Sequence, residues 1–264
     1  MLKILICLIA GAGAGFGTGI AGLSAAAVIA PMLITFLNVE PYEAIGIALA
    51  SDVLASAASA YTYKKHGNID VKNGIIMLIT VMAFTVIGSL AASYLPQTTM
   101  GNFSKFSMLL MGVKFIVKPV MAAKESNIKR TKKQAIIQSL ICGIPIGLIC
   151  GFIGAGGGMM MLIILSTVLG YELKTAVGTS VFIMTFTALT GAVSHFAIGG
   201  GITDYSILIL CIVFTLVAAR ITAKFANKTT PNALFITLGV VLLANFAVIR
   251  AATRVKTMHR ISIE

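Results

Sequence analysis

The residues with the clearest chemical potential in this chain are glycines that interrupt an apolar segment. Residues 151–158 read Gly-Phe-Ile-Gly-Ala-Gly-Gly-Gly. Glycine costs about 1 kcal/mol relative to alanine in a helix interior and frees the backbone for other angles, so this run predicts a helix break. A break uncovers backbone N–H groups at the start of the following half-helix, where anions bind. The candidate anion ligands are Gly154, Gly156, Gly157 and Gly158, and close helix crossing through small residues is the alternative explanation.

A second segment rich in small residues, 11–26, lies nearer the N-terminus. It aligns with the later segment at a constant offset of 132 residues. The same offset places Glu40 on Glu172. At this offset Gly22 corresponds to Gly154, and Ser24-Ala25-Ala26 stands where the later segment has its glycine triplet. Gly22 and Ser24 are therefore the corresponding candidates for substrate binding.

Asp52 is a carboxylate within the apolar run Ala50-Ser51-Asp52-Val53-Leu54. Ionisable groups inside membrane helices are costly and are functional candidates by default. We predict that Asp52 takes up and releases a proton, as a proton-coupling residue does. The alternative is a structural carboxylate paired with a cation or with hydroxyls. The neighbouring hydroxyl of Ser51 joins the list of substrate-binding candidates.

Other polar side chains fall inside predicted helices. Lys114 is expected either to counter an anionic substrate or pair with Asp52, or to snorkel toward the cytoplasmic face. Thr179 and Ser180 are expected to place hydroxyls near the later glycine break, although such groups often bond carbonyls of their own helix. Arg220 is expected to anchor a helix at the membrane interface.

Uncharged segments of membrane-spanning length must position these residues. The chain has 264 residues, of which 58% are hydrophobic and 11% charged. Each uncharged segment reaches the roughly 20 residues that span a bilayer as a helix. Backbone amides in lipid must be satisfied within their own segment, so we predict an all-α integral membrane protein. The segments without Asp, Glu, Lys or Arg are 4–39, 73–104, 134–171, 175–203 and 229–249.

The segments form two similar units. Residues 1–123 are predicted to form a first transmembrane repeat, 124–133 a basic cytoplasmic linker, and 134–264 a second repeat with a basic C-terminal tail. Each repeat starts with an interrupted region, giving about eight transmembrane helices plus half helices in two tandem repeats of four. Predicted helices lie near 42–63, 72–95, 104–121, 173–197, 204–225 and 231–250, and the interrupted regions near 3–37 and 134–170.

Basic residues in short loops predict the orientation. Lys64 and Lys65 are expected in the cytoplasm, which puts Lys224 and Lys228 outside, a mild violation of the positive-inside rule. Both units share one orientation if each interrupted region crosses the membrane once, and become inverted if either region crosses twice.

Several classes of function are excluded by what the sequence lacks. The three histidines are scattered and the four cysteines lie in apolar segments without CxxC pairing, so neither a metal site nor a cofactor is expected. No catalytic constellation is present, and we predict that the protein is not an enzyme. Basic residues concentrate beside apolar segments, as in cytoplasmic loops of membrane proteins, which argues against nucleic-acid binding.

The combined motifs resemble those of the TauE/SafE sulfite exporter family. They comprise Gly154–Gly158 with the following aliphatic residues, Gly178-Thr179-Ser180, the loop Gly67-Asn68-Ile69-Asp70, and Pro31-Met32-Leu33. The chain departs from the family pattern at Ser24-Ala25-Ala26, at Ile163 and at Ile47-Ala48. The resemblance implies a multi-pass permease or exporter in the cell membrane for sulfite, a sulfonate or a related small anion. An anion channel is the alternative, and the sequence leaves a homo-oligomer open.

Overall fold

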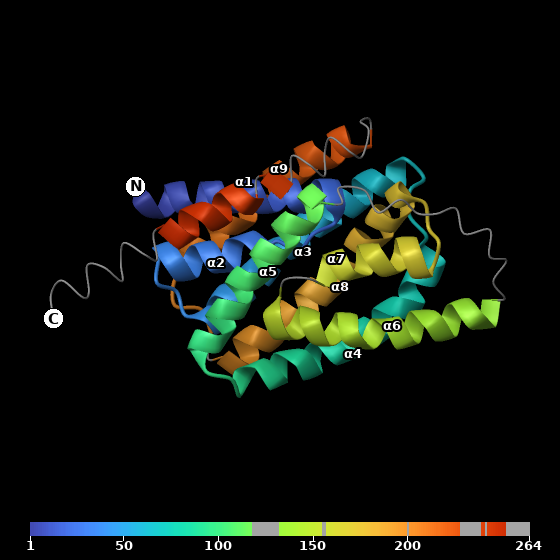
Figure 1. The fold of residues 1–264 in the computed structure, drawn as a ribbon, viewed down its shortest axis with the longest axis horizontal. Coiled ribbons are helices and arrows are strands. Elements are labelled where there is room, and N and C mark those ends of the chain that lie inside the picture. Colours follow the sequence, from blue (N-terminus) through green and yellow to red (C-terminus); the bar gives the residue numbers. More distant parts are fainter. Residues whose placement is uncertain (118–131, 155–156, 200, 228–238, 241, 252–264) are drawn as a thin grey trace, which may run out of the picture.

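The computed structural model describes residues 1–117, 132–154, 157–199, 201–227, 239–240 and 242–251, and these residues are mainly helical (Figure 1). Six of the described helices are long and apolar enough to cross a membrane, in agreement with the predicted fold class: α1, α3, α4, α8, α9 and residues 136–153 of α6. The elements are α1 (Leu2–Ala21), α2 (Ala26–Phe36), α3 (Pro41–Lys65), α4 (Val71–Ser93), α5 (Gln97–Val117), α6 (Lys132–Ile153), α7 (Gly157–Ile163), the π-helix η1 (Ile164–Val168), α8 (Leu173–Gly199) and α9 (Tyr205–Ala226), with a further short helix at Leu242–Ala251.

Local sequence signals explain several helix ends. Pro41 occupies the first turn of α3, where its missing N–H costs nothing. Asp70 accepts a hydrogen bond from the backbone N–H of Asn73 at the start of α4, and Asp204 caps α9 in the same way through Ser206. These two caps lie at corresponding positions of the two units.

Two helix pairs pack through glycine faces at opposite sides of the fold, α1 on α9 and α6 on α4 (Figure 1). On α1, a Cβ at Gly15 would collide with the carbonyl oxygen of Thr215, and on α6 a Cβ at Gly151 would collide with that of Thr85. Only glycine lets these backbones approach so closely. The two faces align at the offset that relates the repeats, and they consist of Gly11, Gly15 and Gly19 on α1 and of Gly143, Gly147 and Gly151 on α6.

Helices at corresponding positions of the two units run in opposite directions. Helices α3 and α8 correspond, because their first residues, Pro41 and Leu173, align at the repeat offset. They are antiparallel, because Gly46 near the start of α3 lies against His195 near the end of α8, and Tyr63 near the end of α3 lies against Gly178. Of the two orientations that the sequence leaves open, the inverted one agrees with these contacts.

The inversion arises because the first interrupted region crosses the bundle and returns. Helices α1 and α9 start together at the Lys3–Asp204 ion pair. Helix α3 starts at the same end, where Glu43 accepts hydrogen bonds from Thr203. The segment from α1 to the start of α3 thus begins and ends on one side. We call this side the acidic end, defined by Glu40, Glu43 and Asp204.

The opposite side carries mainly cations, and we call it the basic end. Lys65 at the end of α3 and Lys224 near the end of α9 line one pocket there. Lys174 lies at the same end, donating to the carbonyl oxygen of Asn227. The expectation that Lys224 lies across the membrane from Lys65 is wrong, and its violation of the positive-inside rule disappears. Lys228 lies outside the described residues.

Candidate substrate site

The two helix breaks meet in the interior of the protein. The Ser24 hydroxyl donates a 2.7 Å hydrogen bond to the carbonyl oxygen of Gly154, joining the start of α2 to the end of α6. A Cβ at Gly158 would collide with the carbonyl oxygen of Gly22, so the start of α7 lies against the end of α1. Each half-helix N-terminus therefore faces the C-terminus of the interrupted helix of the other unit, an arrangement in which opposite ends of helix dipoles attract.

Both breaks use a left-handed glycine. Gly22 has φ 63° and Gly154 has φ 69°, and neither angle suits a residue with a Cβ. The N–H of Gly154 still bonds the carbonyl oxygen of Cys150 at 2.9 Å, so α6 ends there. Helix α7 begins at Gly157, and the predicted break is present. Gly156 lies outside the described residues.

The only carboxylate that faces the first break is that of Asp52, as far as the described residues go, and it is fully buried in the middle of α3. Its Oδ1 accepts a 3.0 Å hydrogen bond from Ser56 and lies 3.4 Å from the hydroxyl of Thr18. The single Thr18 proton has a closer acceptor in the carbonyl oxygen of Leu23, at 2.8 Å. Oδ2 has no hydrogen-bond partner, although the amide of Ala25 and the hydroxyl of Ser24 approach the carboxylate.

This environment is short of donors for a charged carboxylate. Buried polar groups normally have all their hydrogen bonds made, and a buried charge needs a partner or several donors. Ser56 gives Asp52 one clear donor. Within the described residues, Asp52 pairs with hydroxyl groups and with no cation.

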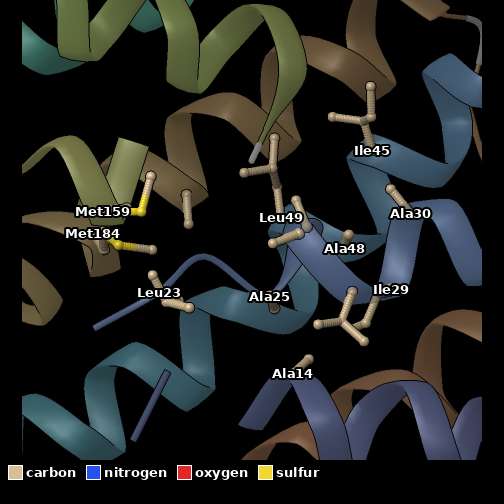
Figure 2. Close-up of a cluster of buried hydrophobic side chains, with 14 of the residues drawn as sticks. Ala14, Leu23, Ala25, Ile29, Ala30, Ile45, Ala48, Leu49, Met159 and Met184 are labelled. Atoms are coloured by element: carbon tan, nitrogen blue, oxygen red, sulfur yellow. The ribbon is translucent and has the colours of Figure 1, made fainter. Parts of the chain in front are cut away.

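Among the described residues, no carboxylate takes the equivalent place at the second break. At the repeat offset, Met184 corresponds to Asp52 and Cys150 to Thr18. A Cβ at Gly158 would lie 2.5 Å from the sulfur of Met184, so this methionine covers the start of α7. Figure 2 shows Met159, Met184 and Leu23 together in the apolar cluster beside the breaks. The α2 terminus therefore faces an internal acid, whereas the α7 terminus faces an apolar side chain.

The remaining candidates fall in three groups. Ser180 lies against Gly22 at the first break, with its own proton bonded to the carbonyl oxygen of Val177. Ser51 is buried and bonds the carbonyl oxygen of Ile47 within its own helix. Thr179 lies away from the breaks, where it accepts a hydrogen bond from the N–H of Asp70. The side chain of Lys114 is outside the description, so its pairing with Asp52 stays a prediction.

Of the hydroxyls near the Asp52 carboxylate, sequence analysis named Ser24 but missed Thr18 and Ser56. Ser56 has a usable signal, because it follows Asp52 by one helical turn and so lies on the same helix face. Thr18 has none, since its contact depends on how α1 crosses α3.

A buried histidine ties the end of α6 to its neighbours. Both ring nitrogens of His195 face backbone carbonyl oxygens, at 2.9 Å from Gly151 and 3.2 Å from Tyr42. The Tyr42 hydroxyl donates to the carbonyl oxygen of Ser89, whose own hydroxyl donates to that of Gly151. This closed network joins α3, α4, α6 and α8 within one helical turn of Gly154.

A polar cluster outside the spanning helices holds α4 against the start of α8. Asp70 accepts hydrogen bonds from the side chain of Asn73 at 2.6 Å and from the hydroxyl of Tyr171 at 2.8 Å. Partial burial alone raises the pKa of Asp70, but these hydrogen bonds outweigh it and hold that pKa below its usual value. The pKa of Tyr171 is raised, by burial and then by the neighbouring carboxylate.

Comparison with known proteins reveals the same kind of molecule. A sequence model of the family described as Sulfite exporter TauE/SafE matches residues 7–248, which include both breaks. The probable membrane transporter protein YdhB of Bacillus subtilis is 26% identical over 228 residues, which cover 86% of this chain and 90% of that protein. A probable membrane transporter protein of Haemophilus influenzae is 30% identical over 205 residues, or 75% of each chain.

Proposed function

Because this chain belongs to the sulfite exporter TauE/SafE family of membrane transporters, we propose that it is a secondary transporter that moves a small anion across the cell membrane. The chemical class we propose is sulfite, a sulfonate or a related organic anion. The names of its relatives are those of membrane transporters, so the prediction of a multi-pass transporter and not an enzyme is confirmed.

The observation that carries the proposal is the contact between two broken helices in the interior. Non-helical backbone at membrane depth is tolerated where it is buried in protein or lines a cavity, and half-helix N-termini attract anions there. The α7 terminus is the better substrate site, because the side chain that covers it among the described residues is the apolar Met184. An anion that displaced this side chain would meet the amides of Gly157 and Gly158.

Two inverted repeats, 1–123 and 134–264, would move about this contact. Inverted repeats built around discontinuous helices are common in secondary transporters, where rocking of one repeat against the other alternates access. In the present arrangement each terminus is neutralised by the carbonyl end of the other break. Separation of the breaks would free both termini to face an anion from one side of the membrane.

Asp52 supplies a route to proton coupling in this scheme. Its carboxylate and a substrate anion would occupy one small interior region of low dielectric, where like charges repel strongly. Protonation of Asp52 removes that repulsion. We therefore expect the anion and a proton to be carried together in the same direction.

The test is counterflow in proteoliposomes that contain the purified protein. A carrier takes up labelled sulfite faster when unlabelled sulfite is present on the far side, whereas an anion channel, the alternative function, shows no such stimulation. Thiosulfate, sulfonates and small carboxylates are then compared as competitors. A lack of counterflow with all of these anions would refute the carrier mechanism.

The site assignment has a matched pair of variants. Gly158→Ala places a methyl group against the carbonyl oxygen of Gly22 and should abolish counterflow. Gly101→Ala adds the same group where its nearest neighbour is 3.5 Å away and should leave flux unchanged. Equal flux in the two variants would show that the breaks do not bind the substrate.

A further inference from the structure

A pocket of about 610 Å³ opens between α3 and α9 at the basic end. It is lined by Ala58, Tyr61, Thr62 and Lys65 from α3, by His66 directly after that helix, and by Arg220 and Lys224 from α9. These residues, all within the described part of the chain, include four basic side chains and no carboxylate. The pocket is separate from both helix breaks and does not depend on the proposed transport site.

The cations of this pocket have no anionic partner in the part of the chain that the structure describes. The single ion pair found there joins Lys3 to Asp204 at the acidic end. Arg220 and Lys224 lie one helical turn apart on α9, a spacing at which like charges destabilise a helix. The dipole at the end of α9 accounts for Lys224, but Arg220 lies more than one turn from Ala226 and gains little from it.

The shape of the pocket suits a ligand that reaches from water into the membrane. Ala58, Tyr61, Thr62 and Lys65 have the spacing of one helix face, so the pocket extends along α3 for about 10 Å. Its inner end is lined by the small residue Ala58 and by Tyr61, whose side chain is 72% exposed. At the outer end a 2.8 Å hydrogen bond between Nδ1 of His66 and the carbonyl oxygen of Thr62 fixes the imidazole beside the cations.

We propose that this pocket binds a phosphate group, carried by an anionic lipid headgroup or by a soluble phosphate. A guanidinium and two ammonium groups would bind the phosphate oxygens, the guanidinium through paired N–H groups. Basic pockets between transmembrane helices on the cytoplasmic side recognise lipid headgroups in this way. The positive-inside rule assigns the basic end to the cytoplasmic side.

The experiment measures binding to the purified full-length protein in detergent. Three ligands are added separately: phosphatidylglycerol, phosphatidylcholine and inorganic phosphate. The pocket variant is Arg220→Gln/Lys224→Gln. Its control, Lys64→Gln/Lys72→Gln, removes the same charge from exposed lysines that do not line the pocket. Lys65→Gln tests the α3 side with one substitution.

Loss of two cations should weaken binding of phosphatidylglycerol about thirtyfold, and loss of Lys65 alone about fivefold. The control should bind as the wild type does. If the ligand is a lipid headgroup, only phosphatidylglycerol should bind more weakly to the pocket variants than to the control. If the ligand is a soluble phosphate, inorganic phosphate should show that difference. Equal losses in pocket and control variants, or binding of neither phosphate ligand, would overturn the proposal. Unchanged thermal unfolding in phosphatidylcholine verifies that the variants are folded.

Discussion

Asp52→Asn is the most informative single substitution, because it removes the acid and keeps the shape of the side chain. The variant retains an oxygen that accepts the hydrogen bond from Ser56, now between neutral groups. A hydrogen bond to a charged group is worth about 1.5–3 kcal/mol and a neutral one about 0.5–1.5 kcal/mol, so the change costs about 1 kcal/mol. Relief of the buried charge offsets part of this loss. The variant should therefore fold.

The effect on coupling is larger than the effect on stability. If one proton accompanies each anion, a gradient of one pH unit can accumulate the anion about tenfold, since one unit corresponds to about 1.36 kcal/mol. In Asp52→Asn the same gradient should give no accumulation. Counterflow at equal pH should persist in the variant, because exchange needs no proton movement.

The assay imposes the pH gradient on proteoliposomes and measures uptake of labelled sulfite. Asp204→Asn is the matched control, since it removes a carboxylate from the exposed start of α9. It should accumulate the anion as the wild type does. If Asp52→Asn also accumulates the anion about tenfold, the proton is carried elsewhere and the reasoning about this carboxylate is wrong.

The other predictions concern the supporting structure and are measured by thermal unfolding in detergent. Gly154→Ala should lower the free energy of unfolding by about 2–5 kcal/mol, because φ 69° is strained for alanine and the new Cβ would lie 2.7 Å from a methyl group of Ile45. Gly67→Ala, at φ 74° in open space, should lose only the roughly 1–2 kcal/mol of backbone strain. Equal losses in the two variants would exclude the packing effect at Gly154. His195→Phe should cost about 1–3 kcal/mol by removing the ring N–H that donates to one of the two facing carbonyl oxygens, and an unchanged melting temperature would refute that role. Asp70→Ala should cost about 1 kcal/mol near neutral pH. Hydrogen bonds hold the folded-state pKa of Asp70 below its unfolded value. The extra stability of the wild type over Asp70→Ala should therefore be complete above about pH 4 and vanish as the pH falls through the lower, folded-state pKa. Extra stability that persists in acid would contradict this assignment.

The elements were predictable because lipid imposes a strong constraint on sequence. A helix that crosses a membrane needs a long uncharged segment, and α8, predicted near 173–197, occupies Leu173–Gly199. The break at Gly154 was also predictable, because the destabilising effect of several glycines on a helix is local and does not depend on which elements pack against it. The domain boundaries and the substrate-binding roles stay predictions.

Helix direction and side-chain partners were not predictable. Loop charge gave conflicting signals at Lys65 and Lys224, because the sequence does not reveal that the region from α1 to α3 crosses and returns. Asp52 illustrates the second limit. Thr18 reaches the carboxylate from α1, and that contact exists only once α1 has packed. The pairing of Lys114 with Asp52 stays a prediction, because the Lys114 side chain lies outside the described residues.

The two glycine faces, on α1 and on α6, find their partner helices at different times during synthesis. The Ser89–Gly151 contact between α4 and α6 joins residues 62 apart, whereas the Gly15–Thr222 contact between α1 and α9 joins residues 207 apart. Ribosomes add about 5–20 residues per second, so roughly 10–40 s pass between synthesis of α1 and of its partner. Throughout that interval the glycine face of α1 must contact lipid or the insertion machinery instead of α9. Although α1 is synthesised first, it is therefore among the last helices to complete its packing.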